Sequence, residues 1–177
     1  MSAARTIKNS LLSLTGLAVV WFLAVAIPLW IAALGNNLFS LRLGPLRFAG
    51  WIPIFLGSGV ILWCYGTFIF IGGGTPWPFA PPKRLVVAGF YRFTRNPMEG
   101  GCLLVVLGET LLLESPAVLL YLVFGFLLLH IRQVAIEEPI LRRRFGQSYE
   151  QYCRSVPRWV PRLRVSPGKG EGRPAKR

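Results

Sequence analysis

Two clusters of polar residues interrupt an otherwise apolar chain of 177 residues. The first cluster is Tyr91 with Arg95, Asn96 and Pro97, just before a long apolar run. If that run is a helix, its first turn offers unpaired backbone N–H groups and the positive end of the helix dipole. Both features suit a carboxylate or another anionic group. Interfacial arginines at an ordinary helix entry give the same pattern, so these residues alone leave both interpretations open.

The second cluster follows the last apolar run. His130, Gln133 and Glu137 are spaced i, i+3 and i+7, which places them on one face of a helix. Glu138 stands directly beside Glu137, and adjacent carboxylates near a membrane are costly unless they are solvated or paired. Nearby arginines could neutralise the two glutamates, or the pair could hold a cation such as an α-ammonium group.

The composition excludes several common kinds of site. All seven acidic residues are Glu, which excludes Asp-based metal clusters, EF-hand loops and Ser-His-Asp triads. The single His and three scattered Cys residues share no spacing motif, so we expect no metal site made of protein ligands. Twenty Lys and Arg residues bring the net charge to +13. Because these residues flank apolar runs, they indicate contact with lipid head groups and not with nucleic acid.

Apolar runs of membrane length must position these clusters. A helix needs about 20 apolar residues to cross the hydrocarbon core of a bilayer. The third run is too long for one span and is interrupted at Glu114-Ser115-Pro116, which predicts a tight helical hairpin whose short first arm only just spans. We therefore expect an all-α integral membrane protein. Its four transmembrane helices are predicted at Leu11–Leu34, Phe48–Ile71, Met98–Leu113 and Pro116–Ile136.

The basic residues at the helix ends predict the orientation of the chain. If both termini lie on one side of the membrane, 18 of the 20 basic residues lie on that side as well. The positive-inside rule then places both termini in the cytoplasm. A short chain with a basic tail and no targeting signal fits a bacterial inner membrane.

The remaining segments are predicted from composition and periodicity. Gly72–Pro82 is rich in Gly and Pro and is expected to form a linker at the membrane surface. Leu141–Tyr152 carries apolar residues at i, i+4, i+8 and i+11, which predicts an amphipathic helix that lies on the membrane or caps the helix ends. Residues 166–177 are expected to be a disordered basic tail, so that residues 1–165 form a single domain.

Four blocks of sequence together resemble a known family. They are Gly89-Phe90-Tyr91, Arg95-Asn96-Pro97-Met98, Glu137-Glu138-Pro139-Ile140-Leu141, and Phe145-Gly146 with Tyr149 and Tyr152. In order and spacing they resemble the integral-membrane methyltransferases related to isoprenylcysteine carboxyl methyltransferase and to the phospholipid N-methyltransferases. The resemblance covers about Leu85 to Pro161. It implies a helical fold that binds S-adenosylmethionine without a Rossmann domain, in a cytoplasm-facing pocket roofed by the C-terminal segment.

The resemblance also implies which residues hold the cofactor. They are Tyr91, Arg95, Asn96, Pro97, Glu137 and Glu138. This fits the local chemistry, since a carboxylate can hold the α-ammonium group of the cofactor and a helix start can hold its carboxylate. Two positions depart from the pattern: Asn96 stands where many relatives have His, and Glu99 stands where Tyr is usual. Asn can form hydrogen bonds but does not titrate, and Glu99 brings a charge to the mouth of the pocket.

The implied reaction is methyl transfer to a lipophilic or membrane-borne acceptor, such as an isoprenylcysteine-like carboxylate, a phospholipid amine or a small thiol. In-line transfer from a sulfonium requires positioning and a nucleophile in the right protonation state. We expect His130, which titrates near neutrality, to face the acceptor, and Arg132 to orient an anionic one. Two alternatives stay open: a relative of the NADPH-dependent sterol-type reductases, and a non-catalytic membrane protein that retains the fold. The sequence does not indicate an oligomeric state.

Overall fold

The computed structural model describes residues 15–35, 42–67, 85 and 87–162. The predicted linker Gly72–Pro82 and the predicted tail 166–177 lie outside the described residues. Within them the chain is entirely helical apart from turns and extended segments, and no strand occurs there. The expected all-α fold is therefore confirmed.

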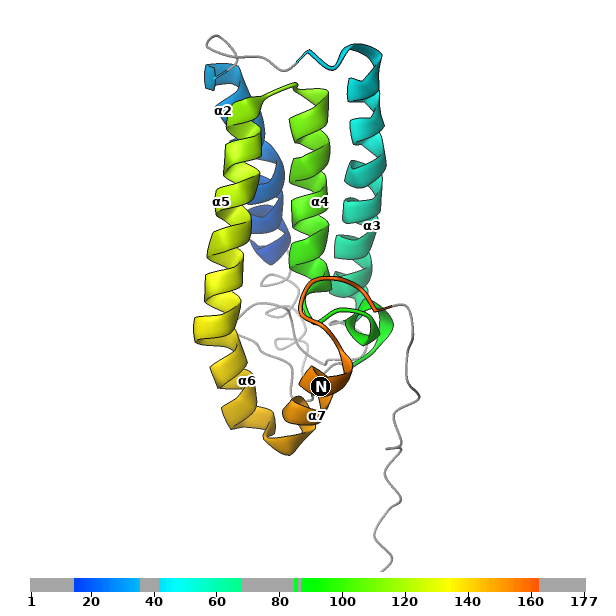
Figure 1. Cartoon of the computed structure of the whole chain (residues 1–177), viewed down its shortest axis with the longest axis vertical. Helices are drawn as coiled ribbons and strands as arrows, with labels where there is room; N and C mark the ends of the chain where they lie inside the picture. The colour runs from blue at the N-terminus through cyan, green and yellow to red at the C-terminus, as the bar shows by residue number, and fades with distance from the viewer. Residues whose placement is uncertain (1–14, 36–41, 68–84, 86, 163–177) are drawn as a thin grey trace, which may run out of the picture.

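Antiparallel helices form the body of the molecule. In Figure 1, α4 lies between α3 and α5, and α2 lies behind them. The hairpin between α4 and α5 is at one end of these helices, and the short helices α6 and α7 are at the other. The elements are η1 (Phe22–Ala26), α2 (Ile27–Gly35), η2 (Gly44–Gly50), α3 (Trp51–Thr67), η4 (Gly89–Arg92), α4 (Pro97–Leu112), α5 (Pro116–Arg132), η5 (Gln133–Glu137), α6 (Glu138–Phe145) and α7 (Gln147–Ser155).

Three helices of the described chain are long and apolar enough to cross a membrane. They are Thr15–Gly35, Gly44–Thr67 and Pro116–Phe145. They correspond to three of the four predicted spans, and their outward faces carry many exposed large apolar side chains, as contact with lipid requires. The fourth predicted span corresponds to α4, which has 16 residues.

Two pairs of glycines bring η2 and α3 into close contact with α4. A Cβ atom added to Gly57 would lie 2.4 Å from the carbonyl oxygen of Gly101, and one added to Gly50 would lie 2.4 Å from that of Gly108. Gly50 and Gly57 are seven positions apart, as are Gly101 and Gly108, and seven residues make two turns of a helix. The absence of side chains lets the two backbones approach, as small residues do at helix contacts within membranes. This contact fixes the beginning of α4 against α3.

The hairpin between α4 and α5 breaks at Glu114-Ser115-Pro116, as predicted. Pro116 occupies the first turn of α5, where a missing N–H group leaves no helical bond unmade. Glu114 has a φ of 50°, and its Oε1 accepts from the backbone N–H groups of Leu43 at 2.7 Å and Gly44 at 3.0 Å. These N–H groups stand at the start of η2, so the carboxylate caps a helix that precedes it by about 70 residues.

Two prolines are accommodated by wider π-helical turns. The N–H of Ile27, just before Pro28, donates to the carbonyl of Phe22 five residues back, and the N–H of Glu138, just before Pro139, donates to Gln133 in the same way. Proline removes a donor and its ring crowds the preceding turn, and a π turn relieves both problems without ending the helix. The last membrane-length helix therefore runs on to Phe145, and the prediction that it ends at Ile136 is wrong.

The prediction of a single amphipathic helix at Leu141–Tyr152 is also wrong, because two helices, α6 and α7, cover this segment. The chain turns at Gly146, whose φ of 52° and ψ of −128° separate α6 from α7. Tyr149 and Tyr152 of α7 are buried in a small apolar cluster with Val156. This cluster docks α7 across the end of the helices, so that the following residues 156–162, here called the strap, pass over the start of α4 (Figure 1).

Candidate functional site

The strap is attached to the segment that leads into α4. The backbone N–H of Arg95 donates to the carbonyl of Pro157 at 2.9 Å, and the N–H of Arg162 donates to that of Phe93 at 3.0 Å. The hydroxyl of Thr94 donates to the carbonyl of Arg158 at 2.9 Å. These bonds hold residues 93–95 in place just before the helix, where the predicted cofactor residues lie.

Asn96 and Pro97 begin α4 in a buried position. Asn96 is only 4% exposed, and its side chain does not cap the helix. Its amide nitrogen, Nδ2, is buried without a hydrogen-bond partner among the described residues. Because an unsatisfied buried donor is costly, this atom marks a place that suits an acceptor from a ligand. The first N–H groups of α4 point toward the same end of the helix.

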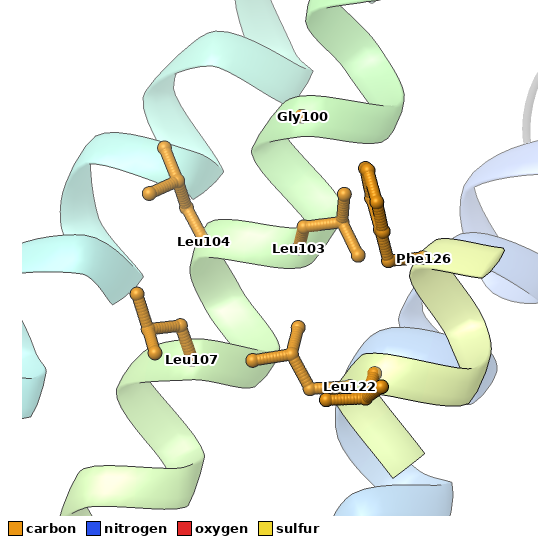
Figure 2. A pocket seen from close by; sticks show the side chains of 7 residues that line it. Gly100, Leu103, Leu104, Leu107, Leu122 and Phe126 are labelled. Carbon is orange, nitrogen blue, oxygen red and sulfur yellow. The ribbon is translucent and has the colours of Figure 1, made fainter. Parts of the chain in front are cut away.

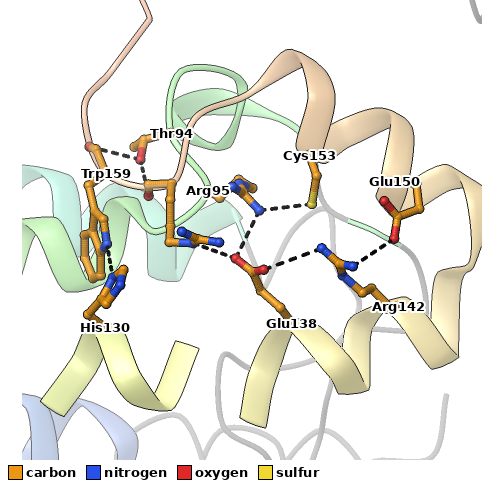
Figure 3. Close-up of polar contacts among 9 residues, drawn as sticks. Thr94, Arg95, His130, Glu138, Arg142, Glu150, Cys153 and Trp159 are labelled. Carbon is orange, nitrogen blue, oxygen red and sulfur yellow. Dashed lines mark hydrogen bonds and ion pairs between the residues drawn. The ribbon is translucent and has the colours of Figure 1, made fainter. Parts of the chain in front are cut away.

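Arg95 lies beside Asn96 and is held by Glu138. Its Nη1 donates to Oε1 of Glu138 at 3.1 Å and lies 3.0 Å from the sulfur of Cys153 (Figure 3). Its Nε is a second buried donor that has no partner within the described part of the chain. Two unsatisfied donors on consecutive residues strengthen the indication of a binding site for an acceptor-rich or anionic group.

Glu138 lies at the centre of an arginine cluster (Figure 3). Its side chain is 5% exposed, and its Oε1 also accepts from Nε of Arg158 at 2.7 Å. Arg142 approaches the other oxygen at 3.8 Å and pairs at the surface with Glu150 at 3.4 Å. The hydrogen bond to Glu138 raises the pKa of Arg158, so this guanidinium group stays charged. Several guanidinium groups around one buried carboxylate leave surplus positive charge on this side of the site.

Glu137 belongs to a different cluster. Consecutive helix residues point about 100° apart, and the two carboxylates have different partners. Glu137 pairs with Arg132, whose Nη2 also donates to Oε1 of Glu99 at 3.1 Å. One guanidinium group thus serves two carboxylates, which leaves surplus negative charge here. The structure therefore does not bring Glu137 and Glu138 together around one cation.

His130 lies beneath the strap. The indole N–H of Trp159 donates to Nδ1 of His130 at 3.0 Å (Figure 3). The imidazole also stacks on the ring of Phe126. Since Nδ1 accepts this hydrogen bond, a neutral His130 carries its proton on Nε2 and donates from that atom.

An apolar groove runs between α4 and α5 toward these clusters. It has a volume of about 350 Å³, and Figure 2 shows leucines of α4 facing Leu122 and Phe126 of α5. Its lining residues are Gly100, Leu103, Leu104, Leu107, Leu122, Val123 and Phe126. Gly100 directly follows Glu99, and Phe126 stacks on His130. The groove is thus suited to an alkyl or isoprenoid chain whose polar end reaches the two clusters.

Tyr91 has a supporting position. Its backbone carbonyl accepts from the hydroxyl of Tyr152 at 2.7 Å, which joins α7 to η4. Burial raises the pKa of the Tyr91 hydroxyl well above its usual range, so this group stays neutral and serves as a hydrogen-bonding group. The Tyr91 side chain forms a hydrogen bond with the thiol of Cys64 on α3. Tyr91 therefore links α3, η4 and α7 beside the predicted site.

Sequence reasoning missed three residues of this region: Arg158, Trp159 and Thr94. All three contact partners at least 20 positions away in the chain, so no local periodicity marks them. The only signal was the Pro157-Arg158-Trp159-Val160-Pro161 segment, in which two prolines fix an extended backbone between a basic and an aromatic residue. The other predicted residues lie within one connected region.

The chain is similar in sequence to known proteins. The chain is similar to the cobalt-zinc-cadmium resistance protein CzcN of Cupriavidus metallidurans, with 29% identity over 154 residues, covering 81% of this chain and 67% of that protein. The family model described as phospholipid methyltransferase matches residues 46–148, which include α3, α4, α5 and the acidic pair. That match covers more than half of the chain and confirms the resemblance seen in the sequence blocks. The protein therefore belongs to the phospholipid methyltransferase family, a family of membrane-associated methyltransferases.

Proposed function

We propose that this protein transfers a methyl group from S-adenosylmethionine to a lipophilic or membrane-borne acceptor. The observation that carries the proposal is the pair of buried, unsatisfied donors at the start of α4, Nε of Arg95 and Nδ2 of Asn96. Arg95 belongs to the cluster with surplus positive charge, and Asn96 stands three residues before Glu99 of the cluster with surplus negative charge. A zwitterionic amino-acid group, such as the methionine part of this cofactor, has the complementary distribution of charge.

Each predicted cofactor residue has a role in this proposal. Asn96, Arg95 and the free N–H groups after Pro97 receive the carboxylate of the cofactor, and Glu137 receives its ammonium group. Glu138 acts indirectly, because it holds Arg95 and the strap in place. Tyr91 supports the floor of the site. When bound, S-adenosylmethionine supplies an electrophilic methyl group on a positively charged sulfur.

The acceptor occupies the groove between α4 and α5 with its apolar chain. Its reacting group then lies near His130 and Arg132, at the end of the groove that Phe126 and Gly100 line. His130 donates a hydrogen bond from Nε2 to an anionic or neutral oxygen of the acceptor. Arg132 orients anionic groups, while a carboxylate, an amine and a thiol all remain compatible with the groove itself.

The same proposal extends to the membrane. The helix α4 serves as a fourth, short span, because it lies alongside the three membrane-length helices (Figure 1). Both termini face the cytoplasm, and the membrane is a bacterial inner membrane. Residues 1–165 act as one domain, followed by a basic tail from residue 166.

Calorimetric titration of S-adenosylmethionine into the purified protein in detergent tests the cofactor site. We expect micromolar binding by the wild type. Asn96→Ala is expected to weaken binding about tenfold, the effect of one lost hydrogen bond to a charged group. Glu137→Ala is expected to weaken it similarly, because the ammonium group loses its partner.

Gln151→Ala, at an exposed position of α7, is the matched control and should bind like the wild type. The absence of binding by a wild-type protein that keeps its helical circular dichroism spectrum would overturn the proposal. Titration with NADPH in parallel identifies the reductase alternative, and failure of both ligands identifies a non-catalytic protein.

A further inference from the structure

One carboxyl group lies inside the helix bundle and has no part in the proposed reaction. Glu109 stands in the last turn of α4, on the side of that helix opposite the groove. It comes one turn after Val105 and Val106, which belong to the main apolar core together with Ala24 of η1. Glu109 is only 6% exposed, and its Oε2 is buried without a hydrogen-bond partner among the described residues.

The hydroxyl groups beside Glu109 donate to other atoms. Thr110, the next residue of α4, donates to the carbonyl of Val106 at 2.8 Å. Tyr121 of α5, which interacts electrostatically with Glu109, donates to the carbonyl of Leu23 in η1 at 2.8 Å. Each hydroxyl has a single hydrogen to donate, so neither satisfies Oε2.

The π turn in η1 explains why Tyr121 donates to Leu23. In a regular helix the N–H of Ile27 would donate to Leu23, but here it donates to Phe22. The next residue is Pro28, which has no N–H group. The carbonyl of Leu23 therefore takes the hydroxyl of Tyr121, and this bond fixes η1 against α5 on the side of α4 where Glu109 lies.

The described residues around Glu109 supply no ion pair for a carboxylate. η1 and α2 contain no ionisable side chain, and His130 and Arg132 of α5 lie at the strap end. The other ionisable side chains on the elements packed around α4 are Arg47, Cys64, Tyr65, Cys102, Glu114 and Tyr121. The one cation of this group, Arg47, is exposed and lies over the ring of Phe48, 4.9 Å from its centroid.

Two physical effects disfavour a negative charge at this position. An ionised carboxyl group in apolar surroundings is costly unless a cation or several hydrogen-bond donors accompany it. The last turn of α4 is also the negative end of its helix dipole, which repels a carboxylate. The neutral acid avoids both penalties.

We propose that Glu109 is a proton-binding site inside the bundle, and that the bound proton stabilises the packing of η1 and α2 on α4. In the unfolded chain this carboxyl group is hydrated and ionised at neutral pH. Folding therefore takes up one proton. The free energy of unfolding then decreases as the pH rises, until the folded protein releases the proton as well.

Denaturant unfolding in detergent at several pH values tests the proposal. Glu109→Gln has nearly the shape of the neutral acid but does not titrate. The ratio of the wild-type unfolding constant to that of Glu109→Gln should rise about tenfold per pH unit between pH 6 and 8, the change expected for one proton. Glu150→Gln removes a carboxylate from an exposed ion pair and should keep the pH dependence of the wild type.

Labelling of the wild type with dicyclohexylcarbodiimide gives a second measurement that does not depend on the folding of a variant. This apolar reagent reacts with protonated carboxyl groups, so peptide mass spectrometry should find it on Glu109 at pH 7. Glu114, whose carboxylate is bonded to two backbone N–H groups, should stay unlabelled.

Three outcomes would overturn the inference. The first is a ratio of unfolding constants that does not change with pH. The second is the absence of label on Glu109 at pH 7. The third is that sodium chloride prevents the labelling and stabilises the wild type relative to Glu109→Gln, because a bound metal cation and not a proton would then neutralise the carboxylate. None of these measurements involves methyl transfer, so their failure leaves the proposed function intact.

Discussion

Trp159 donates its indole N–H to Nδ1 of His130 across 3.0 Å and packs its ring on Phe126 at a centroid distance of 5.2 Å. This contact joins the strap to α5 directly above the groove. One residue of the C-terminal segment thereby fixes the tautomer of the histidine and closes the polar end of the groove.

The strap should loosen when this hydrogen bond is removed. Trp159→Phe keeps an aromatic ring against Phe126 but loses the N–H donor, and the bond is worth about 1 kcal/mol. We expect faster hydrogen exchange of the strap amides and of the Arg95 N–H, which donates to Pro157. Hydrogen exchange with mass spectrometry measures this. Val160→Ala, at an exposed position of the same strap, should leave exchange unchanged, and equal exchange in Trp159→Phe and wild type would contradict the prediction.

The glycine contact between α3 and α4 should tolerate no methyl group. Gly57→Ala places a Cβ atom 2.4 Å from the carbonyl oxygen of Gly101, so the two helices must move apart. We expect a loss of about 1–3 kcal/mol of stability, typical of overpacking. Thermal unfolding in detergent measures it. Gly59→Ala is the control on the same helix, because a Cβ there meets no atom within 4 Å, and equal effects of the two substitutions would argue against the close contact.

Glu114 should stabilise the protein from the opposite end of the helices. Its carboxylate caps the N–H groups of Leu43 and Gly44, and loss of a helix cap typically costs about 1 kcal/mol. Glu114→Ala is expected to lower stability by about this amount. Glu114→Gln should lose less, because its amide oxygen still accepts the two bonds without the charge. Denaturant unfolding of both variants gives the comparison, and identical values for Glu114→Ala and wild type would exclude the cap.

Glu138 should matter more for stability than a surface carboxylate. Glu138→Gln leaves Arg95 and Arg158 without their buried partner, and breaking a buried ion pair from one side costs about 3 kcal/mol. Glu150→Gln disrupts an exposed pair, which contributes at most about 1 kcal/mol. Denaturant unfolding curves of the two variants should therefore separate clearly. Curves that coincide would show that the cluster around Glu138 does not hold the site together.

A larger side chain at Gly100 should fill the groove and prevent the acceptor from binding there. A Cβ at Gly100 meets no atom within 4 Å, so Gly100→Leu is expected to fold while its side chain fills the groove. For a long-chain lipid acceptor we expect kcat/KM to fall at least about tenfold, because the chain can no longer bind. Calorimetric binding of S-adenosylhomocysteine should be retained.

Gly125→Leu is the matched control for the groove. Gly125 also has open space around its Cβ position, but it is not among the residues that line the groove. This variant should keep the kcat/KM of the wild type. If Gly125→Leu and Gly100→Leu reduce kcat/KM equally, the groove between α4 and α5 is not where the acceptor binds.

The sequence by itself determined the helical architecture and the family. Membrane-length apolar runs and the Glu114-Ser115-Pro116 break each depend on residues close together in the chain, and such local patterns directly reflect helix periodicity and backbone sterics. The blocks around Arg95-Asn96-Pro97 and Glu137-Glu138 likewise indicated the site region. The helix end at Ile136 was predicted wrongly, because a π turn lets the chain pass Pro139 without stopping.

Only the tertiary structure decided which side chains meet. Residues far apart in sequence are joined by the glycine pairs between α4 and the continuous helix η2–α3, by the cap from Glu114 to Leu43, and by the bond from Trp159 to His130. Nothing in the local spacing encodes such partners, because they depend on how whole helices pack and where the strap crosses them. For the same reason the sequence left open whether the two adjacent glutamates pair with arginines or hold a cation together, whereas the fold gives each glutamate its own arginine partners.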